Sequence, residues 1–208
     1  MFRLYYAPGT CALATHIALE EAGARYEAVP VDFGSQAQRS SEYLAINAKG
    51  RVSRAGDGKR HTHRNSRLLL FVAQRLPKAE LAPLSDPFAL AQLQEFNIYL
   101  ARPCWSRTRM AGGSALGGRC RSDRGDERKV LTTMTECFEL IERKLLKGPW
   151  VMGEQYRTCD PYLFTIGTWI QGDGVDTTKL PRVMENRKRM LTRPAVQKAG
   201  ATEGTQIS

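Results

Sequence analysis

The first quarter of the chain alternates runs typical of strands with runs typical of helices. Residues 2–6 are rich in aromatic strand formers, a Pro-Gly turn follows, and residues 12–23 have the composition of an apolar helix. A second strand is predicted over 26–31, where Pro30 lacks a backbone N–H and therefore indicates an edge or irregular position in a sheet. With a short helical segment at 42–46, the order β, α, β, α predicts an α/β fold.

Strand signals end in the second half of the chain, and apolar residues recur there at helical spacing. The helices predicted from this pattern cover 90–100, 130–145, 160–166 and 181–191, and an earlier apolar helix is predicted over 68–76. Residues 78–87 are rich in proline and indicate a linker. We therefore predict an α/β domain over 1–78 and an all-α domain over 87–203.

Two blocks interrupt this pattern. Block 53–67 contains Ala55 as its only hydrophobic residue, and block 102–124 is rich in Arg, Gly and Ser without a helical period. Their net charges of +4 and +5 make up nine of the ten net positive charges of the chain. The first block should supply further strands but offers no core residues, so the sequence leaves open whether those strands form.

Composition places the chain among folded proteins, since 42% of its 208 residues are hydrophobic and 25% are charged. It has no secretory signal pattern and no run near the roughly 18 apolar residues of a membrane helix, so we expect a cytoplasmic protein without a membrane partner. The five cysteines are an odd number with no close pair. This favours free thiols in a reducing compartment over disulfides, and no zinc-binding spacing is present.

The net charge of +10 raises nucleic acid as a partner. The two basic blocks, however, lack the regular aromatic spacing of a base-stacking surface and match no recognition motif, so we predict no nucleic-acid partner. His61 and His63 form the one histidine pair, but two histidines without a third ligand are usually solvated. We therefore predict no metal site.

The strand–turn–helix unit at the start of the chain carries the clearest chemical signal, because Cys11 stands at the first residues of the helix. The first N–H groups of a helix are unpaired and carry partial positive charge, which favours the thiolate of a cysteine placed there. The alternative is that Cys11 is a small buried hydrophobe, which is the commonest state of a free cysteine. Position alone leaves both interpretations open.

Several motifs in the expected order and spacing resemble the glutathione S-transferases, most closely the bacterial beta class. They are LYYAPGTC at 4–11, HIAL at 16–19, YLAINAKGRV at 43–52, GPWVMG at 148–153, CDPYLF at 159–164 and RPAVQ at 193–197. The resemblance implies a thioredoxin-like glutathione-binding domain, an all-helical domain that forms the acceptor pocket, and a homodimer. It implies conjugation of glutathione, as co-substrate, to a small electrophilic substrate, or glutathione-dependent thiol exchange.

The same resemblance assigns site residues. The cysteine matching Cys11 contacts the glutathione sulfur and can form a mixed disulfide with it, and a tyrosine matching Tyr6 lies nearby, so these two are the expected catalytic residues. The backbone at Val52 is expected to pair with the peptide-like part of glutathione. The glutathione-binding set implied in this way comprises Thr10, Cys11, Val52, Asn65 and Ser66.

Most departures from the family pattern fall in the two blocks. Ser53 replaces a cis-proline, and because a non-proline cis bond costs about 3 kcal/mol we expect a trans bond and a displaced loop. Where the family has an acidic residue and a Ser/Thr for the γ-glutamyl end, the chain has Arg64, Asn65 and Ser66. Trp105 and Ile98 stand where the beta class has a histidine and often an asparagine or serine.

A further departure precedes the helix at 160–166. Asp160 is expected to cap this helix with Pro161 as its first residue, and the Ser/Thr of the family's capping box is Arg157, with Thr158 as a substitute. These changes leave a second hypothesis, a catalytically impaired protein that keeps the fold and dimer but binds glutathione weakly.

We interpret both blocks as short out-of-frame readings, and the nucleotide sequence tests this. The other frames should encode a proline–aliphatic strand pair and a histidine-bearing helix.

Overall fold

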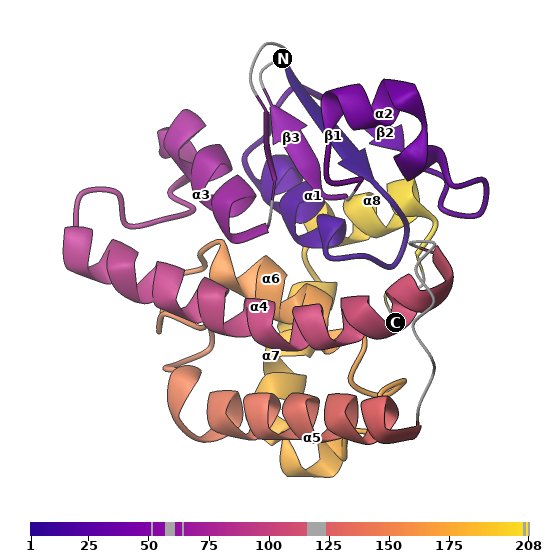
Figure 1. Cartoon of the computed structure of the whole chain (residues 1–208). Helices are drawn as coiled ribbons and strands as arrows, with labels where there is room; N and C mark the ends of the chain where they lie inside the picture. The colour runs from indigo at the N-terminus through magenta and orange to yellow at the C-terminus, as the bar shows by residue number, and fades with distance from the viewer. Residues whose placement is uncertain (51, 57–60, 64, 116–123, 206, 208) are drawn as a thin grey trace.

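The computed structural model describes residues 1–208 except 51, 57–60, 64, 116–123, 206 and 208, and describes side chains outside 54–64 and 102–127. A sheet in the order β2-β1-β3-β4 forms one end of the molecule, with helices around and below it (Figure 1). Its strands are β1 (Phe2–Tyr6), β2 (Tyr26–Pro30), β3 (Arg54–Gly56) and β4 (His61–His63). Strand β1 pairs parallel with β2 and antiparallel with β3.

Strand β2 occupies an edge of this sheet, and Pro30 is its last residue, paired with Tyr6. An edge strand exposes one row of backbone groups, so a proline without an N–H is tolerated there. The edge position predicted from Pro30 is confirmed.

Side chains of β1 alternate between two cores, as the pleat requires. Leu4 and Tyr6 belong to the large core that also contains α1 (Ala12–Glu21) and α3 (Asn65–Arg75). Tyr5 points to the other side and packs with Tyr43 of α2 (Ser41–Ile46). The sheet is therefore covered by α1 and α3 on one face and by α2 on the other.

The rest of the described chain is helical. The long helices α4 (Pro87–Ala115) and α5 (Arg124–Leu140) run side by side (Figure 1), and α5 continues into the π-helical segment η3 (Ile141–Leu145). The buried helix α6 (Cys159–Gly167) packs against α1, α4 and α7 (Pro181–Leu191), and α8 (Pro194–Glu203) returns to α1. Three single-turn 3₁₀ helices connect these elements: η1 (Ala37–Arg39), η2 (Pro77–Ala79) and η4 (Thr177–Lys179). The predicted fold class, an α/β part followed by an all-α part, is confirmed.

The two blocks that depart from the pattern contain regular structure. Strands β3 and β4 form within 53–67, three residues each, which answers the question that the sequence left open. Helix α4 extends through 102–115, beyond the end of the helix predicted over 90–100, where the apolar period stops. A hydrophobic period indicates that one face of a helix is buried. The helix itself is held by backbone hydrogen bonds from residue i to i−4, and Arg, Met and Ala have a high propensity for that conformation.

Two local expectations are corrected. The Val52–Ser53 peptide bond is cis, not trans, and Ser53 is buried with its hydroxyl bonded to another segment, a tertiary contact that the sequence estimate did not include. Helix α6 begins at Cys159, so Asp160 lies inside its first turn and does not stand at the cap position: its carboxylate accepts the backbone N–H of Arg157, which precedes the helix, at 2.8 Å. Thr158 does not replace the missing cap, since its buried hydroxyl has no hydrogen-bond partner.

Within the described part of the chain, no helix combines the length and the apolar character that crossing a membrane requires.

Candidate functional site

The turn between β1 and α1 places Cys11 immediately before the first residue of the helix. Gly9 has φ +70°, a conformation that glycine adopts without the steric cost of a Cβ atom. Cys11 has helical φ and ψ of −64° and −6° and is half-buried. The thiol therefore stands where the sequence predicted it, at the positive end of the helix dipole.

Thr10 closes this turn through its own side chain. Its hydroxyl donates to the Ala7 carbonyl at 2.7 Å, and its oxygen accepts the Ala12 N–H at 3.3 Å. These two bonds satisfy one of the unpaired donors at the start of α1 and hold the chain that leads to Cys11. In this structure Thr10 shapes the helix start.

The helical part of the molecule contacts the same turn through Trp169, which follows α6. Its indole Nε1–H donates to the Gly9 carbonyl at 3.2 Å. Sequence reasoning did not identify this residue. A signal was available, because a partly buried indole N–H usually needs an acceptor, but the sequence does not name the acceptor.

Three segments meet beside Cys11. The Ser53 hydroxyl, just before β3, donates to Oδ1 of Asn65 at 2.8 Å, and Nδ2 of Asn65, the first residue of α3, donates to the Cys11 carbonyl. Ser53 and Asn65 are each 4% exposed. Val52 and Ser66, the chain neighbours of this pair, are half-buried. The structure thus brings Cys11, Ser53 and Asn65 together through hydrogen bonds.

The hydroxyl of Tyr6, the second residue expected to be catalytic, is bound on the side of α8. The hydroxyl donates to the Thr202 carbonyl on α8 at 3.3 Å, and burial raises the pKa of Tyr6, with the Glu203 charge adding to the effect. A phenol has one proton to donate. While that proton is bound to Thr202, Tyr6 cannot also donate it to a thiolate.

A buried polar network lies beside Tyr6. His16 on α1 is 3.0 Å from Glu203 through Nδ1 and 2.8 Å from the Tyr26 hydroxyl through Nε2, and Tyr26 donates to Glu20. Burial, followed by its bond to Glu20, raises the pKa of Tyr26 well above its ordinary value, and burial also raises the pKa of Glu203. This network joins α1, β2 and α8.

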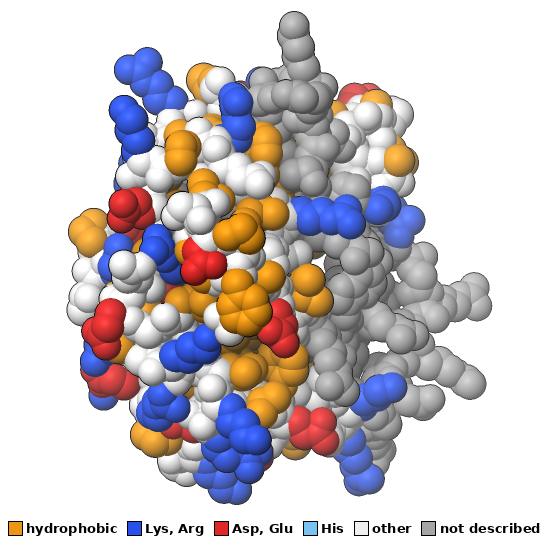
Figure 2. Space-filling model, turned by 90° about the vertical axis from the view of Figure 1, so that its left-hand side faces the viewer, with side chains coloured by type: hydrophobic (Ala, Val, Ile, Leu, Met, Phe, Trp, Pro, Cys, Tyr) orange, Lys and Arg blue, Asp and Glu red, His pale blue; other side chains and the backbone are white. Residues whose placement is uncertain are grey.

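The remaining sequence candidates lie elsewhere. Ile98, at the position matching a polar residue of the beta class, is 63% exposed on α4. The side chains of Arg64, Trp105, His61 and His63 fall outside those that the structure describes. On the face in Figure 2, Lys and Arg side chains of the described surface are interspersed with acidic and hydrophobic ones.

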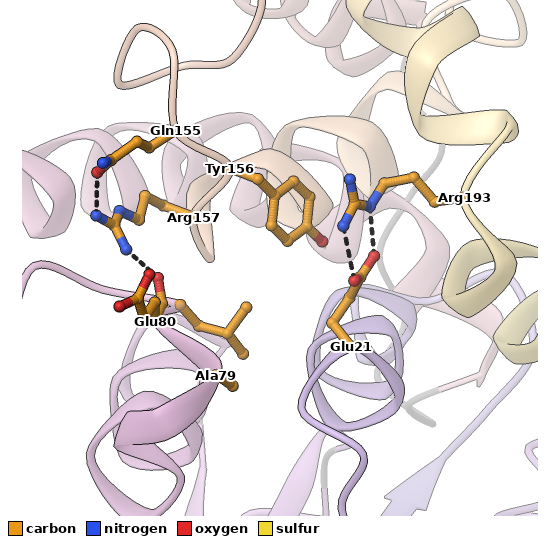
Figure 3. A pocket seen from close by; sticks show the side chains of 8 residues that line it. Glu21, Ala79, Glu80, Gln155, Tyr156, Arg157 and Arg193 are labelled. Carbon is orange, nitrogen blue, oxygen red and sulfur yellow. Dashed lines mark hydrogen bonds and ion pairs between the residues drawn. The ribbon is translucent and has the colours of Figure 1, made fainter.

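A cavity of about 280 Å³ lies at the opposite end of α1 (Figure 3). Arg193 closes one side of it by holding the Glu21 carboxylate with two donors, and Arg157 bonds to the Glu80 carbonyl and to Gln155 on the other. Glu21 is the last residue of α1, so the ten-residue helix separates this cavity from Cys11 by about 15 Å. The cavity is a junction between the two parts of the chain and not the thiol site.

Comparison with known proteins identifies relatives of this chain. Residues 1–52 match the family model described as "Glutathione S-transferase, N-terminal domain". A glutathione transferase homolog from Sulfitobacter, solved with bound glutathione, is 36% identical over 97% of this chain and 98% of its own, with a TM-score of 0.88. The bacterial beta class glutathione S-transferase of Sphingomonas chungbukensis is 27% identical over 97% of this chain and 98% of its own, with a TM-score of 0.83.

A curated relative extends the agreement. Glutathione S-transferase GstA of Escherichia coli O157:H7 is 28% identical over 97% of this chain and 98% of its own length. The chain belongs to the glutathione S-transferase family, as its motifs predicted.

Proposed function

We propose that this glutathione S-transferase binds glutathione at the start of α1 and that Cys11 acts on its sulfur. The observation that carries the proposal is the half-buried Cys11 at the helix start, beside the buried Ser53–Asn65 pair. The Sulfitobacter homolog, similar over nearly the whole chain, was solved with bound glutathione, which supports the same ligand here.

Two reactions fit this arrangement. In conjugation, the glutathione thiolate attacks an electrophilic carbon, an S–C bond forms, and the leaving group departs with its electron pair while the thiol proton passes to solvent. In exchange, the Cys11 thiolate attacks the sulfur of a glutathione disulfide, a mixed disulfide forms, and glutathione leaves as a thiolate. The partial positive charge at the helix start stabilises the thiolate in both reactions.

The other site residues hold the ligand in this proposal. The Val52 backbone pairs with the peptide-like part of glutathione, Asn65 and Ser66 at the start of α3 receive its γ-glutamyl end, and Thr10 holds the turn. Tyr6 contributes through packing, because its hydroxyl proton is bound to Thr202.

The second substrate in this proposal is a small electrophile, and the active form is a homodimer. The cytoplasm is the proposed compartment, because five cysteines, an odd number with no close pair in the sequence, suit a reducing environment. No metal takes part in either reaction as written.

The test combines binding and turnover. The wild-type protein is passed over immobilised glutathione and then assayed with a chlorinated aromatic electrophile and with a small disulfide plus glutathione. We expect Cys11→Ser to lose disulfide exchange by more than about tenfold, whereas the matched control Cys137→Ala, a buried cysteine of α5, keeps it.

Two outcomes oppose the proposal. Full exchange activity in Cys11→Ser would remove Cys11 from the mechanism. A folded wild-type protein that is neither retained nor active would favour the alternative, an impaired protein that keeps the fold and binds glutathione weakly.

A further inference from the structure

Ser53 and Asn65 stand at two places where this chain departs from the pattern of its family, and the structure joins them. Ser53 precedes β3 and Asn65 begins α3, yet the Ser53 hydroxyl lies 2.8 Å from Asn65 Oδ1. The other end of the same amide, Nδ2, donates to the Cys11 carbonyl. One buried amide therefore links the serine to the backbone of the cysteine.

We propose that Ser53 and Asn65 act together as positioning residues for Cys11, with Ser53 orienting the Asn65 amide and Asn65 fixing the Cys11 peptide. The inference rests on the proposed role of Cys11 in thiol chemistry.

The orientation of the amide follows from the chemistry of its partners. A carbonyl oxygen can only accept, so the group facing Cys11 must be the Nδ2 donor. The amide oxygen then faces Ser53, whose hydroxyl supplies the donor it needs. Reversing the amide would put two acceptors against each other in a site that is 4% exposed at both residues, where water cannot relieve the repulsion.

The link controls the thiol because the Cys11 carbonyl belongs to the peptide that opens α1. That carbonyl also accepts the Ala14 N–H at 3.3 Å, which is the first intrahelical bond from Cys11. Holding the carbonyl from both sides fixes the Cys11–Ala12 peptide plane and hence the direction of the Cys11 Cα–Cβ bond. The sulfur is then aimed by residues that do not touch it.

The link also keeps this side of the thiol neutral. A carboxylate at position 65 would have no N–H for the Cys11 carbonyl and would add a negative charge beside a group that works as an anion. One N–H and one lone pair of the Asn65 amide remain for a ligand. Asn65 can therefore serve both the Cys11 backbone and the proposed glutathione site.

The test measures Cys11 directly, without turnover. The rate of alkylation by iodoacetamide is followed across pH by mass spectrometry of the peptide containing Cys11. We expect the midpoint of the rate profile to rise by about one pH unit in Asn65→Asp. Asn65→Ala and Ser53→Ala add no charge, so we expect a broader rate profile or a smaller shift of its midpoint than in Asn65→Asp. Both variants should lower kcat by about tenfold, with little change in KM for the electrophile.

The control is Ser40→Ala. Ser40 caps α2 in the same part of the molecule through a 3.1 Å bond from the Tyr43 N–H, so its loss removes one serine hydrogen bond away from Cys11. We expect a lower melting temperature and an unchanged Cys11 profile. If Asn65→Asp does not fold, Asn65→Ala and Ser53→Ala carry the comparison.

The outcomes separate this inference from the proposed function. If all site variants that fold match Ser40→Ala in their alkylation profile and kcat, the positioning role is overturned even where Cys11→Ser is inactive. If Cys11→Ser keeps full exchange activity, the proposed function fails, whatever the alkylation profiles show.

Discussion

The Glu203 carboxylate on α8 lies 3.0 Å from Nδ1 of His16 on α1, and neither side chain has exposed surface. Because Tyr26 gives its single proton to Glu20, Nε2 of His16 must donate to the Tyr26 oxygen. The hydrogen bond between His16 Nδ1 and the Glu203 carboxylate then contains one proton. The contact between α1 and α8 is therefore a buried hydrogen-bonded pair, and removing either side chain leaves the other without this partner.

Removing one member of this pair should destabilise the protein strongly. We expect Glu203→Ala to lower the free energy of unfolding by about 3 kcal/mol, because it leaves His16 buried without its partner. Glu203→Gln keeps a hydrogen-bonding side chain and should cost about 1 kcal/mol. Urea denaturation of both variants, of His16→Ala and of the double mutant measures the coupling. Additive losses would contradict a direct interaction.

Arg193 should not tolerate replacement by lysine. Its guanidinium binds Glu21 through Nε at 2.5 Å and Nη2 at 2.8 Å and lies 4.0 Å from the centre of the Tyr156 ring. Lysine has neither the two-pronged geometry nor the planar face, so Arg193→Lys should lose about 1–2 kcal/mol of unfolding free energy.

Arg189→Lys is the matched control for that substitution. The Arg189–Glu185 ion pair has a distance of 3.5 Å and both side chains are largely exposed, so we expect a change within about 0.5 kcal/mol. Equal losses in the two variants, measured by chemical denaturation, would show that the junction in Figure 3 adds no stability beyond a surface pair.

Asp160 should make stability depend on pH. Burial raises its pKa from the ordinary 3.8 to about 7, against the opposing effect of N–H donors from Val151 and Arg157. For an acid whose pKa is higher in the folded state, the folded state binds more protons, so stability falls as pH rises between roughly 4 and about 7 and is level above that range.

The difference in unfolding free energy between the wild type and Asp160→Asn isolates this contribution from those of other groups. We expect it to decline over the same range in denaturation curves recorded from pH 4 to 8. A difference that rises with pH would mean that the two backbone N–H bonds outweigh burial and keep the carboxylate ionised.

Tyr6→Phe should separate packing from catalysis. The hydroxyl donates to the Thr202 carbonyl, so its removal should cost about 1 kcal/mol of stability and leave kcat/KM for glutathione within about twofold. Steady-state kinetics beside a thermal melt test this. A tenfold loss of kcat without a loss of stability would show that the Tyr6 hydroxyl acts on the sulfur during catalysis.

The parts of the site that could be predicted are those encoded locally. Strand, turn and helix start at 2–21 are set by neighbouring residues, so Cys11 was found where a thiol at a helix start is expected. Pro30 likewise indicated an edge strand from its missing N–H alone. The length of α4 was underestimated, because the apolar period stops near residue 100 while the helix continues through 102–115.

The sequence by itself determined the family, the change from an α/β part to a helical part and the place of the thiol, because these depend on short motifs and on hydrophobic period. Tertiary structure alone decided what surrounds the thiol. The Ser53–Asn65 contact spans 12 positions, Asn65–Cys11 spans 54, and Tyr6–Thr202 spans 196. The direction of a hydroxyl or an amide depends on which acceptor the fold brings within reach, and no local pattern contains that information.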